Sequence, residues 1–197
     1  MATDDEKIFR CVVGFGGRAR MTSKGHKTGM ERVAEVAISF PCDIIVNVQG
    51  DEPLISPEVI DGAVELLMED PQADIGTLKF PIGEEELLDP NLVKVVTDAR
   101  GYALYFSRAP IPFPRDKGPL PPGLSFYGHV GLYSYRRPVL LKLAEMPPSP
   151  LEEVERLEQL RALEAGFRIK VGTTNHRSIG VDTPEDLKRV EEIIQGD

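Results

Sequence analysis

The chain has 197 residues, of which 41% are hydrophobic and 28% charged, a composition that excludes collagen, a coiled coil and a wholly disordered chain. Its 32 aspartates and glutamates outnumber 23 lysines and arginines, which gives a net charge of −9. An acidic chain has no general attraction for nucleic acid or anionic lipid, so any phosphate that it binds needs a local site or a metal ion.

The sequence carries no sign of a membrane or export segment. No apolar run approaches the ~20 residues of a membrane span, and the N-terminus lacks a basic segment followed by an apolar one. The two cysteines, Cys11 and Cys42, form neither a disulfide framework nor the spacing of metal ligands. We therefore expect a cytoplasmic protein with reduced thiols and with no nucleic-acid or membrane partner.

The first elements along the chain are a helix, a short strand and a second helix. Thr3-Asp4-Asp5-Glu6 has the pattern of a capping box, and apolar residues at helical spacing follow it. This helix leaves no room for a strand before it. A short strand is expected over 18–22 and a helix over 30–40.

The run over 43–48 is a nearly continuous series of β-branched residues, typical of a strand covered on both faces. It ends in Gln49-Gly50-Asp51-Glu52-Pro53, and Ser56-Pro57 then starts another helix. Strand, polar turn and helix form the βα unit of a parallel sheet, in which ligands bind at the carboxyl ends of the strands.

The rest of the chain predicts a mixed α/β architecture. We expect a hairpin turn over 98–101, a proline-rich loop over 110–123, one leucine-patterned helix over 151–163 and a last helix from Thr183 to 194. No linker divides the chain, so we expect a single domain over 1–197 with a mostly parallel sheet and an antiparallel excursion. Further strands are expected over 75–82, 93–97, 102–107, 127–135 and 167–171.

Two acidic positions are candidates for metal binding. Asp51 follows a strand, where a carboxylate suits Mg²⁺, although acidic turns at such places are often only solvated. Asp182 directly precedes the Thr183-capped helix, so it could be a second metal ligand or simply complement the helix dipole.

Other polar residues are candidates for substrate binding. Arg108 ends a strand, and its guanidinium could bind a carboxylate or phosphate through two hydrogen bonds. His129 and Tyr133 lie four residues apart in a strand and so share one face. Glu158 and Gln159 lie within the leucine-patterned helix, where a polar pair usually forms a solvated face, so the pattern alone favours a structural role for each.

Many segments, taken in order, match one family pattern. The chain resembles the 3-deoxy-manno-octulosonate (KDO) cytidylyltransferases, also called CMP-KDO synthetases, over essentially its whole length. The matching segments include Ala2-Thr3-Asp4-Asp5, Val46-Asn47-Val48-Gln49-Gly50-Asp51-Glu52-Pro53, Tyr102-Ala103-Leu104-Tyr105-Phe106-Ser107-Arg108, His129-Val130-Gly131 with Tyr133, Leu157-Glu158-Gln159-Leu160-Arg161 and Gly180-Val181-Asp182-Thr183-Pro184.

This resemblance implies a Rossmann-like nucleotidyltransferase, acting as a homodimer. Its reaction is the Mg²⁺-dependent transfer of CMP from CTP to the 2-hydroxyl of KDO, which gives CMP-KDO and pyrophosphate for lipopolysaccharide biosynthesis. By resemblance, Asp51 and Asp182 are catalytic and hold Mg²⁺, which activates the hydroxyl and neutralises phosphate charge. The resemblance assigns KDO binding to Arg108 (at the carboxylate), His129, Tyr133, Glu158 and Gln159, and the cytidine side to Thr28, Gly29 and Gln49.

The chain departs from the family pattern in two places. Thr28-Gly29-Met30 replaces the family's Ser-Gly-Thr, which removes one hydroxyl near the nucleotide. Family members also open with a strand and a basic glycine loop that holds the triphosphate, whereas this chain starts at the Ala2-Thr3-Asp4 segment. We therefore expect the first strand to be missing, the coding sequence to begin earlier, and the 197-residue chain to be inactive and prone to aggregate.

Three other functions stay open at this stage. The chain could activate a different sugar acid, or it could be a non-catalytic module that binds sugar acids. A metal-dependent hydrolase using Asp51 and Asp182 is a third alternative, but no candidate base lies in the same cluster.

Overall fold

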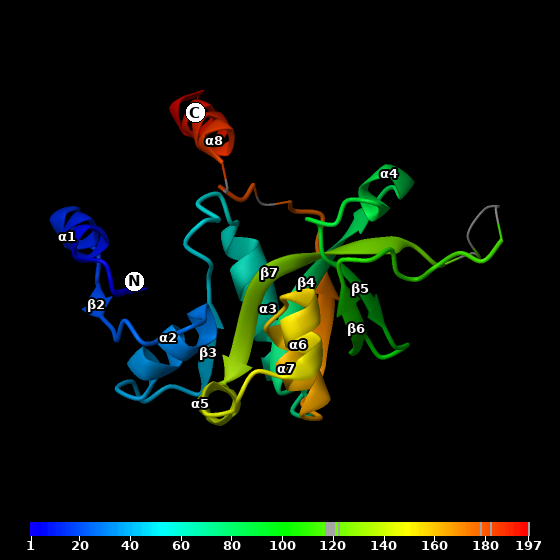
Figure 1. Cartoon of the computed structure of the whole chain (residues 1–197), viewed down its shortest axis with the longest axis horizontal. Coiled ribbons are helices and arrows are strands. Elements are labelled where there is room, and N and C mark those ends of the chain that lie inside the picture. Colours follow the sequence, from blue (N-terminus) through cyan, green and yellow to red (C-terminus); the bar gives the residue numbers. More distant parts are fainter. Residues whose placement is uncertain (117–120, 122, 178, 182, 197) are drawn as a thin grey trace.

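A computed structural model describes residues 1–116, 121, 123–177, 179–181 and 183–196 (Figure 1). In chain order the elements are β1 (Ala2–Thr3), α1 (Glu6–Gly14), β2 (Arg20–Met21), α2 (Gly29–Ala37), β3 (Ile44–Asn47), α3 (Pro57–Glu69), β4 (Ile75–Ile82), α4 (Glu84–Leu87), β5 (Lys94–Thr97), β6 (Ala103–Ser107), β7 (Phe126–Arg136), α5 (Arg137–Ala144), α6 (Pro150–Glu155), α7 (Gln159–Glu164), β8 (Ile169–Thr173) and α8 (Pro184–Gly196).

The main sheet has six strands in the order β6-β5-β7-β4-β8, and β3 pairs with β7 beside this path. Strands β3, β4, β5 and β8 run in one direction, whereas β6 and β7 run in the other. The prediction of a mostly parallel sheet is therefore confirmed for strand direction. Most neighbouring pairs are nevertheless antiparallel, because the long strand β7 lies between β4 on one side and β3 and β5 on the other.

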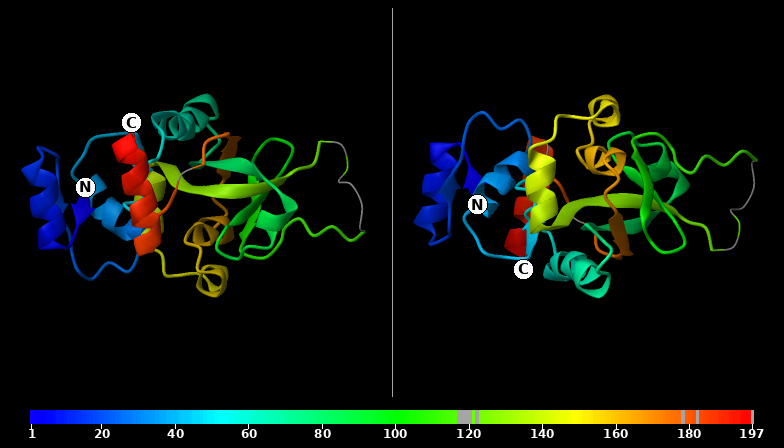
Figure 2. Two further views of the ribbon diagram at one scale, coloured as in Figure 1. Left: turned by 90° about the horizontal axis from the view of Figure 1, so that it is seen from above. Right: turned by 90° about the horizontal axis from the view of Figure 1, so that it is seen from below.

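Helices cover both faces of this sheet (Figure 2). Helix α3 covers one face, where Val59 and Ala63 pack against Leu78, Val130 and Leu132. Helices α2, α5 and α7 cover the other face, in a cluster that includes sheet residues such as Tyr133 and Tyr135. Successive residues of a strand point to opposite faces, so β7 sends Val130 and Leu132 to α3, and His129, Gly131, Tyr133 and Tyr135 to the opposite layer.

The structure corrects several local predictions near the N-terminus. A short strand, β1, precedes α1 after all and pairs in parallel with β2. The cap of α1 is Asp5, whose Oδ1 accepts hydrogen bonds from the amides of Lys7 and Ile8, while Thr3 belongs to β1. Strand β3 is only half-buried except at Asn47, so the prediction of a strand covered on both faces is wrong.

The predicted helix over 151–163 is in fact two helices. Helix α6 starts at the predicted capping box of Ser149 and Glu152, and it ends at Arg156, which adopts a left-handed conformation with φ of 57°. Helix α7 then starts at Gln159. Val154 is 82% exposed, whereas Leu157 and Leu160 are buried, so the leucine pattern is shared between two helices with different buried faces.

Other predictions hold closely. Strand β4 has the predicted bounds, Gly101 closes the predicted hairpin turn with its amide on Asp98 O, and Thr183 caps α8 together with Asp186. Within the described part of the chain, no helix is long and apolar enough to cross a membrane.

Candidate active site

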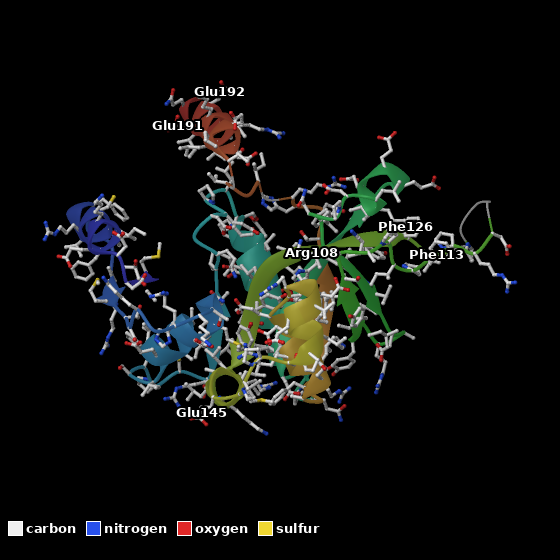
Figure 3. All side chains as sticks on the ribbon, in the orientation of Figure 1. Arg108, Phe113, Phe126, Glu145, Glu191 and Glu192 are labelled. Atoms are coloured by element: carbon white, nitrogen blue, oxygen red, sulfur yellow. The ribbon has the colours of Figure 1, made fainter. Side chains whose placement is uncertain are left out.

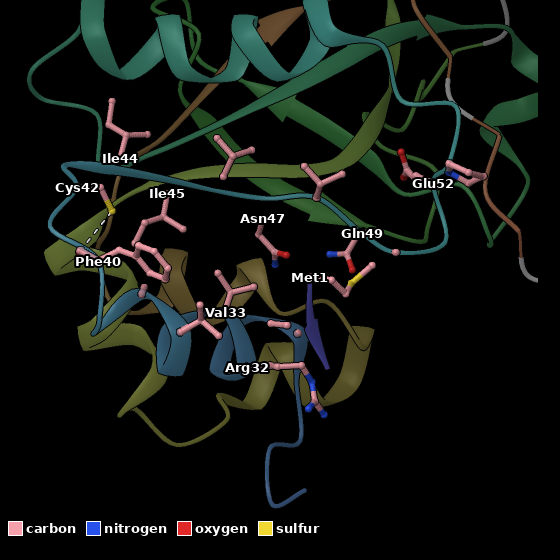
Figure 4. Close-up of a pocket in the computed structure, with 18 residues that line it drawn as sticks. Met1, Arg32, Val33, Phe40, Cys42, Ile44, Ile45, Asn47, Gln49 and Glu52 are labelled. Carbon is pink, nitrogen blue, oxygen red and sulfur yellow. Dashed lines mark hydrogen bonds between the residues drawn. The ribbon is translucent and has the colours of Figure 1, made fainter. Parts of the chain in front are cut away.

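Two cavities meet at the carboxyl end of β3 and the loop that follows it. One, the β3 cavity, has a volume of about 770 Å³ and runs along β3 and α2 (Figure 4). The other, the β7 cavity, has a volume of about 270 Å³. Asn47, Gln49 and Glu52 line both cavities. The β7 cavity is lined by Asn47, Gln49, Asp51, Glu52, Val93, His129, Gly131, Tyr133, Tyr135, Arg156, Leu157, Glu158 and Gln159.

The wall of the β3 cavity combines aliphatic side chains with a few polar groups (Figure 4). Gly29, at the first turn of α2, lies against the shared wall, since a Cβ atom there would be 3.9 Å from both Asn47 Nδ2 and Gln49 Oε1. Thr28 caps α2, and its Oγ1 accepts a hydrogen bond from the amide of Glu31 at 3.3 Å. Gly29 and Gln49 therefore line the cavity, whereas Thr28 shapes the helix start behind it.

One face of β7 supplies buried polar groups to the β7 cavity. His129 stacks against Tyr133 with ring centroids 5.2 Å apart, and its Nε2 lies 2.9 Å from Thr77 Oγ1. The Thr77 hydroxyl has one proton, and its Oγ1 lies 2.7 Å from Leu132 O and 3.2 Å from Val130 O. With that proton on either carbonyl oxygen, His129 Nε2 donates to Thr77 Oγ1 and Nδ1 is an acceptor.

Burial keeps both of these side chains neutral near pH 7. It lowers the pKa of His129 to about 3, and it raises the pKa of Tyr133 well above its usual value. Neutral imidazole and phenol groups are suited to hydrogen bonding with hydroxyl groups of a ligand.

The break between α6 and α7 brings Glu158 and Gln159 to the same cavity. Gln159 is buried, and burial raises the pKa of Glu158. The backbone amides of Met30 and Gly29 lower the pKa of Glu158, which opposes that rise. The α6–α7 junction therefore lies close to the first turn of α2.

Asp51 lies on the rim of the β7 cavity and is exposed. The amide of Val181 donates to Asp51 O at 2.8 Å, so the chain at 181 runs directly beside the loop at 51. Asp182 lies outside the described residues. Among those that are described, no group of three or more His, Cys, Asp or Glu side chains is arranged to hold a metal ion.

Arg108 does not line either cavity in the structure. It lies at the end of β6 beside α6 (Figure 3), where its Nε donates to Glu155 O at 2.9 Å and its Nη1 to Pro90 O at 3.1 Å. The structure thus gathers Gln49, Asp51, His129, Tyr133, Glu158 and Gln159 around one cavity, but not Arg108.

Asn47 and Arg156 are among the lining residues that were not predicted for the site. Asn47 is buried, and its polar side chain within the apolar run over 43–48 was an available signal. Arg156 was hidden by the prediction of one continuous helix over 151–163.

Comparison with known proteins gives a consistent picture. Residues 1–171 match the family model described as "Cytidylyltransferase". A "3-deoxy-manno-octulosonate cytidylyltransferase" of Syntrophotalea carbinolica is 54% identical over 202 residues, which cover 100% of this chain and 81% of the relative. The chain belongs to the 3-deoxy-manno-octulosonate cytidylyltransferase family.

Further relatives agree with this membership. The protein of the same name from Geobacter sulfurreducens is 56% identical, over 99% of this chain and 81% of the relative. A solved structure of "CMP:2-keto-3-deoxy-manno-octonic acid synthetase complexed with CTP" matches with a TM-score of 0.90 and 39% identity, over 98% of this chain and 78% of that one. The prediction of a nucleotidyltransferase fold is therefore confirmed.

Proposed function

We propose that this cytidylyltransferase transfers CMP from CTP to the 2-hydroxyl of 3-deoxy-manno-octulosonate and releases pyrophosphate, as a homodimer in the cytoplasm. The observation that carries the proposal is the pair of adjoining cavities with a common wall of Asn47, Gln49 and Glu52. A transfer between two substrates needs their reacting atoms to be held in contact, and adjoining cavities meet this need.

The β3 cavity is the proposed nucleotide site. Without a side chain at Gly29, a planar base can approach the first turn of α2 and the amide groups of Asn47 and Gln49. Carboxamides both donate and accept hydrogen bonds, as recognition of a base edge requires. The similar solved structure named above is a complex with CTP.

The β7 cavity is the proposed sugar-acid site. Its neutral His129 and Tyr133, together with Gln159 and Glu158, offer both donors and acceptors to sugar hydroxyls. Since these side chains are largely buried before any ligand binds, little ordering is needed on binding.

Asp51 and Asp182 are the proposed ligands of Mg²⁺. The donor chemistry fits, because Mg²⁺ is usually held by one or two carboxylates together with substrate phosphates rather than by a full protein cage. The Val181–Asp51 backbone hydrogen bond supports the pairing, as it holds the two chain segments together. When bound, Mg²⁺ would neutralise charge on the phosphate and lower the pKa of the attacking hydroxyl.

The test is to incubate the protein with Mg²⁺, CTP and 3-deoxy-manno-octulosonate and to measure pyrophosphate release, with the product identified by mass spectrometry. Because we expect the 197-residue chain itself to be inactive, the assay includes a version extended at its N-terminus by the strand and basic glycine loop of the family. We expect that version to release pyrophosphate only with both substrates and to form a product with the mass of the CMP–sugar acid, and it serves as the parent in the kinetic tests below. Sialic acid and an amino analogue of the sugar acid are tested side by side. Preference for one of these would identify a different sugar acid, and calorimetric sugar-acid binding without CTP binding would contradict catalysis.

A further inference from the structure

The segment that follows β8 runs beside the second half of β4 and reaches the loop after β3 before it enters α8 (Figure 1). The amide of Thr174 donates to Lys79 O at 2.9 Å, and the amide of Val181 donates to Asp51 O at 2.8 Å. The proposed pairing of Asp51 with Asp182 depends on the second of these hydrogen bonds. Any contact that holds Val181 in this place therefore bears on the proposed Mg²⁺ site.

Packing contributes little to the position of this segment. None of the described residues over 174–177 and 179–181 is fully buried. The loop that receives the Val181 amide is itself exposed at Gly50 and Asp51. Two exposed segments joined by a backbone hydrogen bond open readily unless other contacts limit their separation.

Arg177 makes contacts of this kind. Its guanidinium binds the Glu86 carboxylate through two hydrogen bonds, Nη1 with Oε1 and Nη2 with Oε2, the second at 3.3 Å. Nη2 also donates to Pro81 O at 2.7 Å, and Cζ lies 4.9 Å from the centre of the Phe80 ring. Since these partners belong to β4 and α4, Arg177 joins the segment after β8 to the sheet and to the helix that follows β4.

Glu86 is itself held in place at the start of α4. Its Oε2 accepts a hydrogen bond from the amide of Gly83 at 3.0 Å. The hydrogen bonds from Arg177 and from this amide lower the pKa of the Glu86 carboxyl, so the group is a carboxylate near pH 7. A pair with two parallel hydrogen bonds has a better defined geometry than a single exposed ion pair, which contributes little.

The length of the chain links the position of Val181 to that of Arg177. Val181 is four residues beyond Arg177, and an extended chain of four residues spans at most about 14 Å. Fixing Arg177 therefore limits the space that Val181 can explore, which lowers the entropy cost of its hydrogen bond with Asp51 O.

We propose that Arg177 is a positioning residue for the transfer reaction: bound to Glu86 and to Pro81 O, it holds Val181 beside Asp51. Arg177 lines neither cavity, so it acts through the chain and not by contact with a substrate. This inference rests on the proposed function, because the position of Val181 matters for catalysis only if the two chain segments share a metal ion.

Hydrogen exchange tests this anchor without any substrate or metal ion. In the N-terminally extended parent, Arg177→Gln and Glu86→Gln should each increase the exchange rate of the Val181 amide about 10-fold, as measured by NMR. Arg177→Lys keeps the charge but not the planar guanidinium, so its rate should be intermediate. The double variant should exchange no faster than Arg177→Gln, because the two side chains act through one contact. The control is Arg10→Gln, which alters an exposed arginine paired with Glu6 on α1 and should leave this amide unchanged.

Steady-state kinetics tests the consequence for the reaction. Arg177 is exposed, so Arg177→Gln should fold as the parent does. It should raise the Mg²⁺ concentration for half-maximal rate about 10-fold, whereas the KM values of CTP and the sugar acid at saturating Mg²⁺ should stay within about 2-fold.

The outcomes separate the role of Arg177 from the proposed function. If the Val181 amide exchanges as slowly in Arg177→Gln as in the parent, or if the Mg²⁺ dependence is unchanged, the role of Arg177 is overturned while the proposed function stands. If transfer by the parent does not depend on Mg²⁺, the proposed metal site and the role of Arg177 are both overturned.

Discussion

The β7 cavity and the β3 cavity differ in how their walls are held. The polar groups of the β7 cavity stand on a long strand with neighbours on both edges, and a buried ion pair braces the adjoining α6 and α7. The β3 cavity is built along a short strand that pairs with β7 on one edge and faces open space on the other. The comparison indicates that the proposed sugar-acid site is preorganised, whereas the shape of the proposed nucleotide site depends less on fixed contacts.

The largest expected effect comes from removing the buried ion pair between Arg161 and Glu152, which holds α6 and α7 together. Arg161 is 1% exposed and holds Glu152 through two hydrogen bonds of 2.6 Å, while its Nη1 donates to Met146 O at 3.0 Å. Arg161→Met leaves the Glu152 carboxylate buried without its partner, so we expect the free energy of unfolding to fall by about 3–5 kcal/mol. Urea denaturation measures this loss.

Arg10→Met provides the matched control for the brace. It removes an exposed i,i+4 ion pair with Glu6, in which the arginine side chain is 76% exposed, and it should change stability little. Equal losses in the two variants would contradict the importance of the buried pair.

The carboxylate on the rim of the β7 cavity is tested by Asp51→Asn. This change removes a charge proposed to act where both substrates meet, so we expect kcat to fall about 10²–10³-fold. The midpoint of urea denaturation should stay within error of the parent, because Asp51 is exposed. Asp61→Asn, on the exposed surface of α3, is the control and should keep full activity. If Asp51→Asn had the same kcat as the parent, Asp51 would have no role in catalysis.

The pH dependence of the free energy of unfolding tests whether the His129 side chain in the β7 cavity is buried and neutral. The pKa of His129 is about 3 in the folded chain and near 6.5 when unfolded, so its neutral form stabilises the fold above pH 6.5. This stability is lost as the pH falls from 6.5 towards 3, at about 1.4 kcal/mol per pH unit. Between pH 7 and pH 5 the parent should lose about 2 kcal/mol more than His129→Gln, as measured by urea denaturation. Parallel curves would show that His129 is not buried in its neutral form.

The smallest expected effects come from a pair of glycine substitutions, one in each cavity. In Gly29→Ala the new methyl group would lie 3.9 Å from Asn47 and Gln49, an ordinary contact that leaves stability unchanged but fills space in the β3 cavity. In Gly131→Ala it would lie 3.2 Å from Glu52 Oε1, which must shift by a few tenths of an ångström.

Steady-state kinetics distinguishes the two glycine variants. We expect Gly29→Ala to raise the KM of CTP, and Gly131→Ala that of the sugar acid, each about 10-fold, the lower end of the effect of an added methylene in a pocket. If both variants raised the same KM, the assignment of one substrate to each cavity would be wrong.

The sequence was most informative where one local pattern settles the structure. The strand expected over 75–82 matches β4 to the residue, and the Ser149–Glu152 capping box predicted the start of α6. It was least informative at Arg156, because a helix break in an otherwise leucine-rich run depends on contacts with Ser107 and Arg108 far away in the chain. The parallel pair of β1 and β2 was missed because two-residue strands leave no periodicity.

The residues of the candidate site, too, were predicted where the local sequence decides their position and missed where tertiary contacts do. Spacing along β7 predicted that His129 and Tyr133 share a face, and the family resemblance pointed to Gln49, Asp51, Glu158 and Gln159, all of which line the β7 cavity. The Arg108 guanidinium is chemically suited to bind a carboxylate, but in the fold it donates hydrogen bonds to the backbone carbonyls of Glu155 and Pro90. These hydrogen bonds join residues that are far apart in the sequence, so a single sequence does not predict them.

Glu158 lies between the two proposed substrate sites. Its side chain lines the β7 cavity, and the backbone amides of Gly29 and Met30, at the start of α2, are close enough to lower its pKa. Gly29 in turn lines the β3 cavity. A ligand that moved the Glu158 carboxylate in the proposed sugar-acid site would therefore change the surroundings of the helix end that borders the proposed nucleotide site.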